Sequence, residues 1–175
     1  MKKIYKAIDK GDLTNLQALL NANNINTCNW HLDNFLHYAA AKGNIAVNDL
    51  LVDMGVNYNA SNAAGLTPID VAIKEKRLAI FSYFLFQLPS ILQQRVGGMG
   101  LIHRVAKYGT TEFIRLLIQE DVSLNEATDR GSTALHIAAQ RGDSDMCYLL
   151  ADHNANINAR DSWGNTPLHK AVIND

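Results

Sequence analysis

The sequence predicts an all-α solenoid built of stacked helix-turn-helix pairs. The first observation is an interval of 33 residues at which residues 129–158 match the rest of the 175-residue chain. The second is that several columns keep the same phase: His37, His103, His136 and His169; Gly43, Gly109 and Gly142; the leucine pairs 50–51, 116–117 and 149–150; and Asn26, Asn59, Asn125 and Asn158. Repetition at such a period is typical of repeat units that bury their apolar faces against their neighbours.

Three further motifs stand in a fixed order within the repeat: Thr166-Pro167-Leu168-His169, the pair Ala138-Ala139, and Gly142. With the 33-residue period, this order resembles the ankyrin repeat over nearly the whole chain. The resemblance implies an ankyrin-repeat solenoid whose helix pairs are joined by β-turn fingers, with the histidines hydrogen-bonded between turns. It says little about the partner, because such a family shares an architecture for binding proteins while each member's target differs.

Residues 1–29 are expected to form an N-terminal capping repeat. A short helix is predicted over residues 3–10, Gly11 breaks it, and leucines at 13, 16, 19 and 20 form the apolar stripe of a second helix. The first helix carries four lysines (Lys2, Lys3, Lys6 and Lys10). A terminal repeat needs such a polar outer face, because no further repeat covers it.

The second repeat, residues 30–62, begins its first helix at Asn34, whose side chain is expected to cap free backbone N–H groups. Leu32 stands where the family has glycine, so we expect a distorted turn there.

The third repeat, residues 63–95, restores Gly65-Leu66-Thr67-Pro68, in which Thr67 should cap the helix and Pro68 takes its first position. It then departs from the pattern, since Lys76 replaces the inter-helix glycine and Asp70 the histidine. Phe86 stands at a usually solvated position. We interpret it as a satellite of the core, the alternative being an exposed apolar contact.

The fourth repeat, residues 96–128, opens with Val96-Gly97-Gly98-Met99-Gly100, without a threonine cap or a proline. A phosphate-binding loop would need G-x-G-x-x-G or a following Gly-Lys-Ser/Thr, and neither is present. We therefore interpret the glycines as a loose turn. The junction of the third and fourth repeats is expected to be the weakest stacking interface of the chain.

The fifth repeat, residues 129–161, is the most regular, and Gly142 is expected to end its first helix with a positive φ. Residues 162–175 form a partial C-terminal repeat that stops after one helix. Lys170, Asn174 and Asp175 supply part of the polar outer face that an end needs. Either this helix is the cap of a single ankyrin-repeat domain spanning residues 1–175, or the chain is a fragment of a longer protein.

Composition argues against several classes of function. The 16 basic and 17 acidic residues nearly cancel, so neither nucleic acid nor a membrane surface is the expected partner. Cys28 and Cys147 lie more than three repeats apart, too far for a disulfide, which predicts free thiols in a reducing compartment. The longest apolar run, 79–88, is too short to span a bilayer. We expect a monomer in the cytoplasm, or in a host cytoplasm if the chain is a secreted effector.

Catalytic, metal and cofactor sites are not predicted. The sequence has no G-x-S-x-G and no His-Glu metal motif, and neither cysteine has a partner histidine and carboxylate at a convincing spacing. Successive histidines of the column are about one repeat, or roughly 10 Å, apart. The ligands of one zinc ion lie within about 4 Å of each other, so the column cannot hold it.

Binding is therefore expected at positions that the fold leaves free. The resemblance implies that a partner lies across the concave surface made by the first helices and the fingertips. The candidates on the first helices are Tyr38, Lys42, Lys74, Arg104, Lys107, Tyr108, Gln140 and Arg141, and those on the fingertips are Trp30, His31, Arg130 and Trp163. Trp, Tyr and Arg dominate binding hot spots, and a basic stripe favours an acidic partner. The alternative is that these basic residues only keep an exposed helix face soluble.

The leading hypothesis is a non-enzymatic protein–protein interaction module. The 18 asparagines suggest either an AT-rich genome or an effector of an intracellular bacterium acting on a host protein. The alternative is a targeting or substrate-recruiting domain of a larger enzyme or toxin. A small inhibitor resembling those of cyclin-dependent kinases ranks third, because the chain has no specific matching motif.

Overall fold

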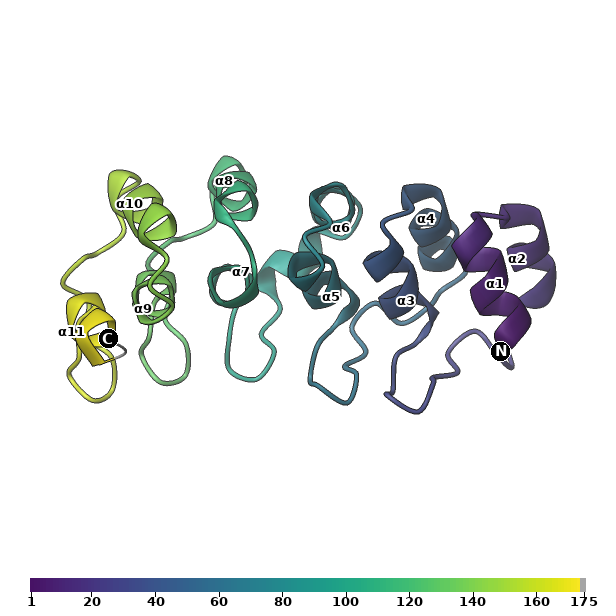
Figure 1. Ribbon diagram of the computed structural model, residues 1–175, viewed down its shortest axis with the longest axis horizontal. Coiled ribbons are helices and arrows are strands. Elements are labelled where there is room, and N and C mark those ends of the chain that lie inside the picture. The colour runs from purple at the N-terminus through teal and green to yellow at the C-terminus, as the bar shows by residue number, and fades with distance from the viewer. Residues whose placement is uncertain (174–175) are drawn as a thin grey trace. The chain divides into compact units, whose positions relative to one another are not determined.

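The computed structural model describes residues 1–173, which fold into helices without a β-strand (Figure 1). The helices are α1 (Lys2–Lys10), α2 (Leu13–Leu19), α3 (Phe35–Lys42), α4 (Ile45–Asp53), α5 (Pro68–Lys74), α6 (Leu78–Gln87), the 3-10 helix η1 (Pro89–Gln93), α7 (Leu101–Tyr108), α8 (Thr111–Gln119), α9 (Ala134–Gln140), α10 (Ser144–Asp152) and α11 (Pro167–Ile173). Among the described residues, no helix combines the length and apolar character needed to cross a membrane. Asn174 and Asp175, expected to contribute to a polar end, lie outside the described residues.

The chain divides into two compact units, Met1–Gln87 and Leu88–Asp175. Unit 1 contains three helical hairpins in which α1, α3 and α5 pack in succession, as do α2, α4 and α6. In unit 2, η1 packs on α7, the helices α7, α9 and α11 pack in succession, and α8 lies beside α10. Each unit thus has the stacked helix pairs that the sequence predicted.

The caps explain where the first helices begin. Asn34 accepts hydrogen bonds from the backbone N–H groups of Leu36 and His37, both at 3.1 Å, which confirms the predicted cap. At the start of α5, the backbone N–H and hydroxyl of Thr67 donate to the carboxylate of Asp70 at 2.9 and 2.7 Å. Asp70 therefore takes over at this helix start the acceptor role that histidine has in other repeats.

The histidine column links successive turns. In His136, Nδ1 accepts from the backbone N–H of Thr133 at 3.1 Å, so Nε2 carries the proton and donates to the carbonyl of Asn165 at 3.0 Å. His37 likewise reaches the carbonyl of Leu66 at 2.9 Å. These contacts confirm the bonding between turns that the family resemblance implied. Among the described residues, no three potential ligand side chains gather into a metal site.

The turns that needed glycine show how the chain departs from its own pattern. Gly142 has φ +66°, as predicted, and Lys76 adopts φ +56° at the equivalent place. Leu32 has φ +61°, the left-handed backbone that Gly65 has in the next finger. Both turns close through similar hydrogen bonds, Asn29 N–H to Asp33 at 3.0 Å and Asn62 N–H to Leu66 at 2.9 Å. The expected distortion is therefore wrong; the turn is kept, and Leu32 is strained instead.

The expected burial of Phe86 also needs correction. Phe86 is 83% exposed, so its interpretation as part of the core is wrong: Phe81, Phe84 and Leu85 already form the buried face of α6, and Phe86 projects from the opposite side. Gly109, which stands in the same column as Gly142, ends α7 with φ −89°, outside the left-handed region.

Candidate partner-binding groove

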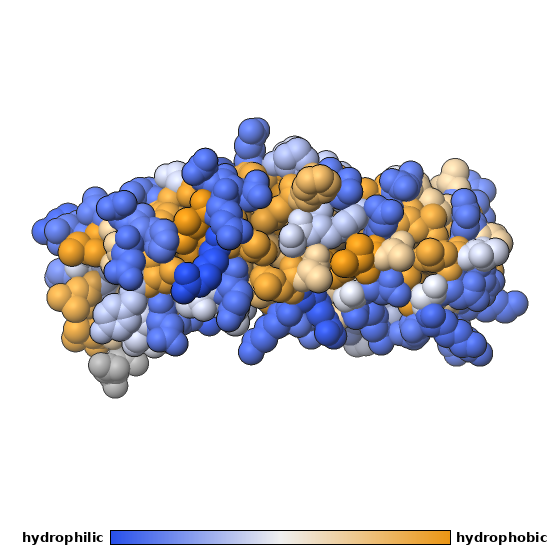
Figure 2. All heavy atoms as spheres, turned by 90° about the horizontal axis from the view of Figure 1, so that it is seen from above, coloured by the Kyte–Doolittle hydropathy of each residue, from blue (hydrophilic) through white to orange (hydrophobic). Residues whose placement is uncertain are grey.

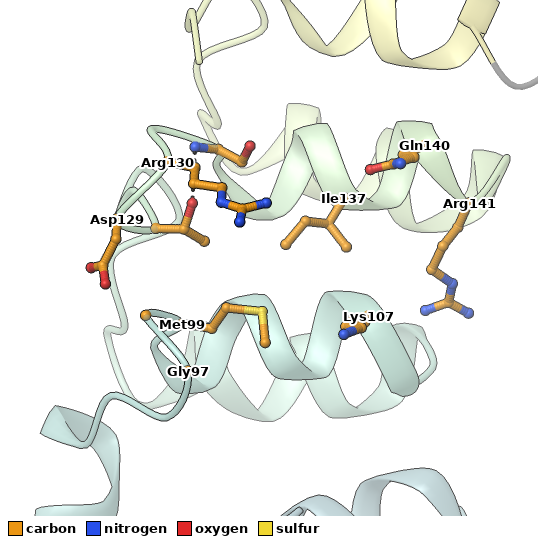
Figure 3. Close-up of a pocket in the computed structure, with 11 residues that line it drawn as sticks. Gly97, Met99, Lys107, Asp129, Arg130, Ile137, Gln140 and Arg141 are labelled. Atoms are coloured by element: carbon orange, nitrogen blue, oxygen red, sulfur yellow. Dashed lines mark hydrogen bonds between the residues drawn. The ribbon is translucent and has the colours of Figure 1, made fainter. Parts of the chain in front are cut away.

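A groove of about 850 Å³ opens in unit 2 beside α7 and α9 (Figure 3). Met99 and Ile137 face it from opposite sides. Arg130 lies at the end nearest the finger, whereas Lys107 and Arg141 lie toward the C-terminal ends of α7 and α9. The remaining lining residues are Gly97, Gly98, Thr128, Asp129, Ser132 and Gln140. The groove thus has an apolar middle with basic side chains at both ends.

The glycine turn before α7 forms one wall. Val96 and Met99 exchange backbone hydrogen bonds of 2.9 and 3.1 Å, and Gly97 and Gly98 both have positive φ, as two-residue hairpin turns require. A Cβ on Gly98 would also lie 2.5 Å from an Asp129 carboxylate oxygen. The turn is therefore tightly defined, and its interpretation as loose is wrong.

Arg95, which belongs to no motif of the repeat, ties this turn to the next finger. Its guanidinium donates to the carbonyl of Gly98 at 2.8 Å, to Glu126 at 2.6 Å and to Asp129 at 2.9 Å. The backbone N–H of Asp129 donates to Gly98 at 3.1 Å. A lone arginine before a glycine turn gives no periodic signal, so its role emerges only from the folded contacts.

The basic residues of the groove are not equivalent. Arg141 donates to the carbonyls of Ala106 and Gly109 at 2.6 and 3.2 Å, and so caps the C-terminal end of α7, where cations are favoured. It also lies 3.5 Å from Asp143. Arg141 is thus held by the fold itself, and its guanidinium is only partly available to a partner.

Lys107 and Arg130 keep their charges available. Lys107 Nζ lies 5.0 Å from the ring centre of Tyr108, and the Arg130 guanidinium 6.0 Å from that of Trp163. Neither forms an ion pair within the part of the chain that the structure describes. The one carboxylate in the lining, Asp129, is paired with Arg95. The groove therefore presents uncompensated positive charge.

The finger beside Arg130 is stabilised by a buried carboxylate. Lys170 Nζ lies 2.7 Å from Asp161 and 5.1 Å from the Trp163 ring centre. Burial opposes ionisation of Asp161, but hydrogen bonds from Lys170 and from the backbone of Asn165 and Trp163 outweigh it and lower the pKa of this carboxyl to about 2. The exposed Trp163 is thereby held on a fixed fingertip.

The unit 1 candidates form a separate set. The Tyr38 hydroxyl and Lys42 Nζ both contact Asp9 at 2.8 Å, and these hydrogen bonds lower the pKa of the Asp9 carboxyl. They join α3 to α1. Trp30 is exposed on the first finger with its ring centre 3.3 Å from that of His31, and Lys74 is exposed at the end of α5.

One candidate, Arg104, does not lie on the surface. Arg104 is 1% exposed, because α7 buries all of its residues from Leu101 to Ala106. The helical spacing placed Arg104 near the concave face, but a partner cannot reach it.

Tyr108 is half-buried beside Lys107, and Gln140 is exposed in the groove. Met99 and Ile137, the apolar lining, were missed because apolar residues in a repeat are ordinarily assigned to the core.

Comparison with protein families matches two models described as ankyrin repeats, one over residues 102–175 and the other over residues 36–85. Among curated proteins, the chain is 28% identical over 99 residues to the transient receptor potential cation channel subfamily A member 1 homolog of Caenorhabditis elegans. The match spans 57% of this chain but only 8% of that protein.

Solved structures share the fold at low sequence identity. A chain of the Bdellovibrio bacteriovorus predatory endopeptidase Bd0816 in complex with immunity protein Bd3460 matches with a TM-score of 0.75 and 22% identity, covering 99% of this chain and 92% of that one. The human ASB11 ankyrin repeat domain matches with a TM-score of 0.75 and 24% identity, covering 96% and 76%. The ankyrin repeat domain of Bcl-3 matches with a TM-score of 0.72 and 18% identity, covering 97% of this chain and 93% of that one.

Proposed function

Because the chain belongs to the ankyrin-repeat family, we propose that it is a non-enzymatic module that binds a partner protein through the unit 2 groove and the adjoining fingertips. Ankyrin repeats form a protein–protein interaction fold. The observation that carries the proposal is the groove itself, in which Lys107, Arg130 and Gln140 surround an apolar middle. Apolar anchoring surrounded by polar side chains is the usual anatomy of an interface.

The partner is proposed to present an acidic surface to this groove. Lys107 and Arg130 carry charges that the fold does not neutralise, whereas Asp129 and Arg141 have internal partners. Complementary charge steers encounter and suppresses wrong partners, so an acidic segment with an apolar side chain between its carboxylates fits best. Arg130 and Trp163, on two successive fingertips, extend the contact with residue types common in hot spots.

A pull-down from eukaryotic cell lysate with mass spectrometry tests this function. The variants Lys107→Glu and Arg130→Glu reverse one free charge each, while Arg115→Glu makes the same change at an exposed position of α8 outside the groove. We expect a protein captured by the native chain and by Arg115→Glu to be lost from both groove variants. Capture that is equal for all four chains would place binding elsewhere and refute the groove.

The effector hypothesis places the partner protein in a host cell. Part of the asparagine content has a structural reason, since Asn26 and Asn125 accept from the backbone N–H groups of Asn57 and Asn156 at 3.0 and 2.7 Å and so link repeats. The asparagine content as a whole supports the proposal of a bacterial protein that acts as a monomer on a host protein, and it does so only as a feature of the amino-acid composition. Sequencing the source locus tests it, and a free-living source organism would count against it.

A targeting domain of a larger enzyme or toxin is the second candidate. It is favoured by the match to the Caenorhabditis elegans channel homolog, in which the similar region is a small part of a long protein. An open reading frame that continues beyond Asp175 into a domain of another fold would support it, and a stop codon there would remove it.

A further inference from the structure

The dimensions of the unit 2 groove limit what can enter it. From Leu101 to Lys107, α7 rises about 9 Å, and the glycine turn adds roughly another 3 Å, so the groove is about 12 Å long. A volume of about 850 Å³ over that length leaves a width of roughly 8 Å. An α-helix with its side chains is about 10–12 Å across, whereas an extended chain is about 5 Å wide in its narrow direction. The groove therefore admits an extended chain more readily than a helix.

The free charges at the two ends of the groove set the spacing of the acidic groups that it can bind. Arg130 lies at the finger end, and Lys107 lies near the C-terminal end of α7 (Figure 3). In an extended segment, side chains at positions i and i+4 lie about 13 Å apart and point to the same side as the one at i+2. In a helix the same two positions are only about 6 Å apart along the axis. An extended segment thus reaches both basic side chains and places its middle side chain against Met99 and Ile137.

The polar lining offers hydrogen-bonding groups to an extended backbone. Such a segment has backbone N–H and C=O groups that must bond outside it, whereas a helix satisfies its own. Thr128 and Ser132 line the finger end of the groove with hydroxyls, and Gln140 lines the end of α9 with an amide. These side chains can both donate and accept. Polar groups of the kind that an extended backbone needs therefore lie on both sides of the apolar middle.

We propose that the occupant of the groove is an extended segment of the partner protein, with acidic side chains at positions i and i+4 and a large aliphatic side chain at i+2. The aliphatic side chain packs against Met99 and Ile137, one carboxylate pairs with Lys107, and the other pairs with Arg130. The carboxylates complement charges that the fold leaves unpaired, since Asp129 is paired with Arg95. This inference rests on the proposed function and adds the conformation of the bound segment and the spacing of its charges.

The probe is the capped peptide Thr-Glu-Thr-Leu-Thr-Glu-Thr, in which threonine favours an extended chain. Its isomer Thr-Thr-Glu-Leu-Glu-Thr-Thr has the same composition but turns both carboxylates away from the side of the leucine. We expect the first peptide to bind at least about tenfold more tightly, because the isomer loses two exposed ion pairs worth about threefold each.

Trp163 provides an internal reporter of this binding. Its ring centre lies 6.0 Å from the Arg130 guanidinium, and Trp30→Phe, a change in unit 1, leaves it as the sole tryptophan of the chain. Its fluorescence should therefore change with the concentration of the first peptide, as Arg130 turns to a carboxylate.

Charge variants of the chain test the two ends separately. Lys107→Glu and Arg130→Glu should each weaken binding at least about threefold, and Arg115→Glu should leave it unchanged. Figure 2 looks onto the side of α8 and α10, where hydrophilic residues lie among hydrophobic ones, and Arg115 belongs to α8. Fluorescence anisotropy of dye-labelled peptides is the measurement, since Arg130→Glu alters the surroundings of Trp163. Circular dichroism should show the same helix content in every variant.

Two further peptides, each with one glutamate replaced by glutamine, test whether a single segment spans the groove. Each should lose its dependence on a different one of the two basic residues, Lys107 and Arg130. The inference is overturned if both depend on the same residue, if the isomer binds as tightly as the first peptide, or if neither binds at millimolar concentration. It is also overturned if a lactam-bridged helical peptide, with a leucine between glutamates about 10 Å apart along the helix, binds more tightly than the extended one.

The pull-down separates a failure of this inference from a failure of the proposed function. A partner that the native chain captures and that Lys107→Glu and Arg130→Glu lose keeps the function, even where the extended segment fails. Equal capture by all the chains would remove both.

Discussion

Leu32 and Gly65 occupy the same place in two successive fingers, yet only glycine adopts the left-handed backbone there without strain. A side chain with a Cβ costs about 1–2 kcal/mol in the left-handed region, where Leu32 lies at φ +61°. Its side chain is more than half exposed and recovers little of that cost by burial. The hydrogen bonds of the finger, including that from Ala63 N–H to His31 at 2.8 Å, hold the backbone in place nonetheless.

The substitution Leu32→Gly should therefore stabilise the protein by about 0.5–1 kcal/mol, because it removes the strain while adding some freedom to the unfolded chain. Urea unfolding followed by circular dichroism measures the change. Leu32→Ala is the matched control, since it shortens the side chain but keeps the Cβ. A gain from alanine as large as that from glycine would show that strain is not the cause.

The buried histidines make stability depend on pH. Burial lowers the pKa of His37 and of His103 below the usual 6.5, so the folded state binds fewer protons than the unfolded state as the pH falls through this region. The free energy of unfolding should decrease between pH 7.5 and 5.5. Asp9 and Asp161 have pKa values lowered from 3.8 and stay ionised in this window, so their contribution is lost only in stronger acid. Urea unfolding at pH 7.5 and at pH 5.5 measures this change. Equal free energies of unfolding at the two pH values would contradict the assignment.

At the scale of elements, the sequence specified the start of each helix better than the direction of each side chain. Capping by Asn34 follows from its type and its place before an apolar run, and could be read directly. The burial of Arg104 and the exposure of Phe86 could not, because they depend on which face of a short helix meets its neighbours. Likewise, two glycines before α7 indicated a turn, but its rigidity comes from Arg95, whose acceptors lie up to 34 residues away.

Removing that arginine tests the role of the turn. Arg95→Ala should lower the stability of the protein by about 1–2 kcal/mol, because the carbonyls of Gly98 and Ala127 and the carboxylates of Glu126 and Asp129 lose a charged donor at a partly exposed site. Arg95→Lys should recover less than half of the loss, since an ammonium cannot span the separate acceptors. Chemical unfolding is the measurement, with Arg115→Ala as a surface control expected to change stability by less than about 0.5 kcal/mol. Equal effects of Arg95→Ala and Arg115→Ala would remove Arg95 from this role.

Hydrogen exchange probes the junction of the third and fourth repeats. Residues 88–99 should exchange faster than α9 and α10, because this stretch has a short 3-10 helix, Pro89–Gln93, and no α-helix. Mass spectrometry of peptides from native-state exchange gives the comparison. Protection of residues 88–99 equal to that of the fifth repeat would refute the expectation of weak stacking.

For the molecule as a whole, the period of 33 residues was sufficient to predict the stacked helix pairs, because the columns record contacts that recur from repeat to repeat. The family was inferred from the resemblance of the motifs within that period to the ankyrin repeat. The candidate groove was only partly predictable. Lys107, Arg130 and Gln140 were identified from their register, but Met99 and Ile137 were not, since the same residue types fill the core elsewhere. The charge that remains available was not predictable either, because it depends on which basic residues, such as Arg141, already have partners in the fold.

Site-specific photo-crosslinking would show whether the unit 2 groove binds a partner protein. Benzoylphenylalanine is placed at Gln140, inside the groove, and in a second chain at Gln119, which is exposed on α8 outside it. A partner should crosslink from position 140 and not from position 119, and Lys107→Glu should abolish the product. Crosslinking of the same partner from position 119 alone, or from position 140 without regard to Lys107, would contradict it.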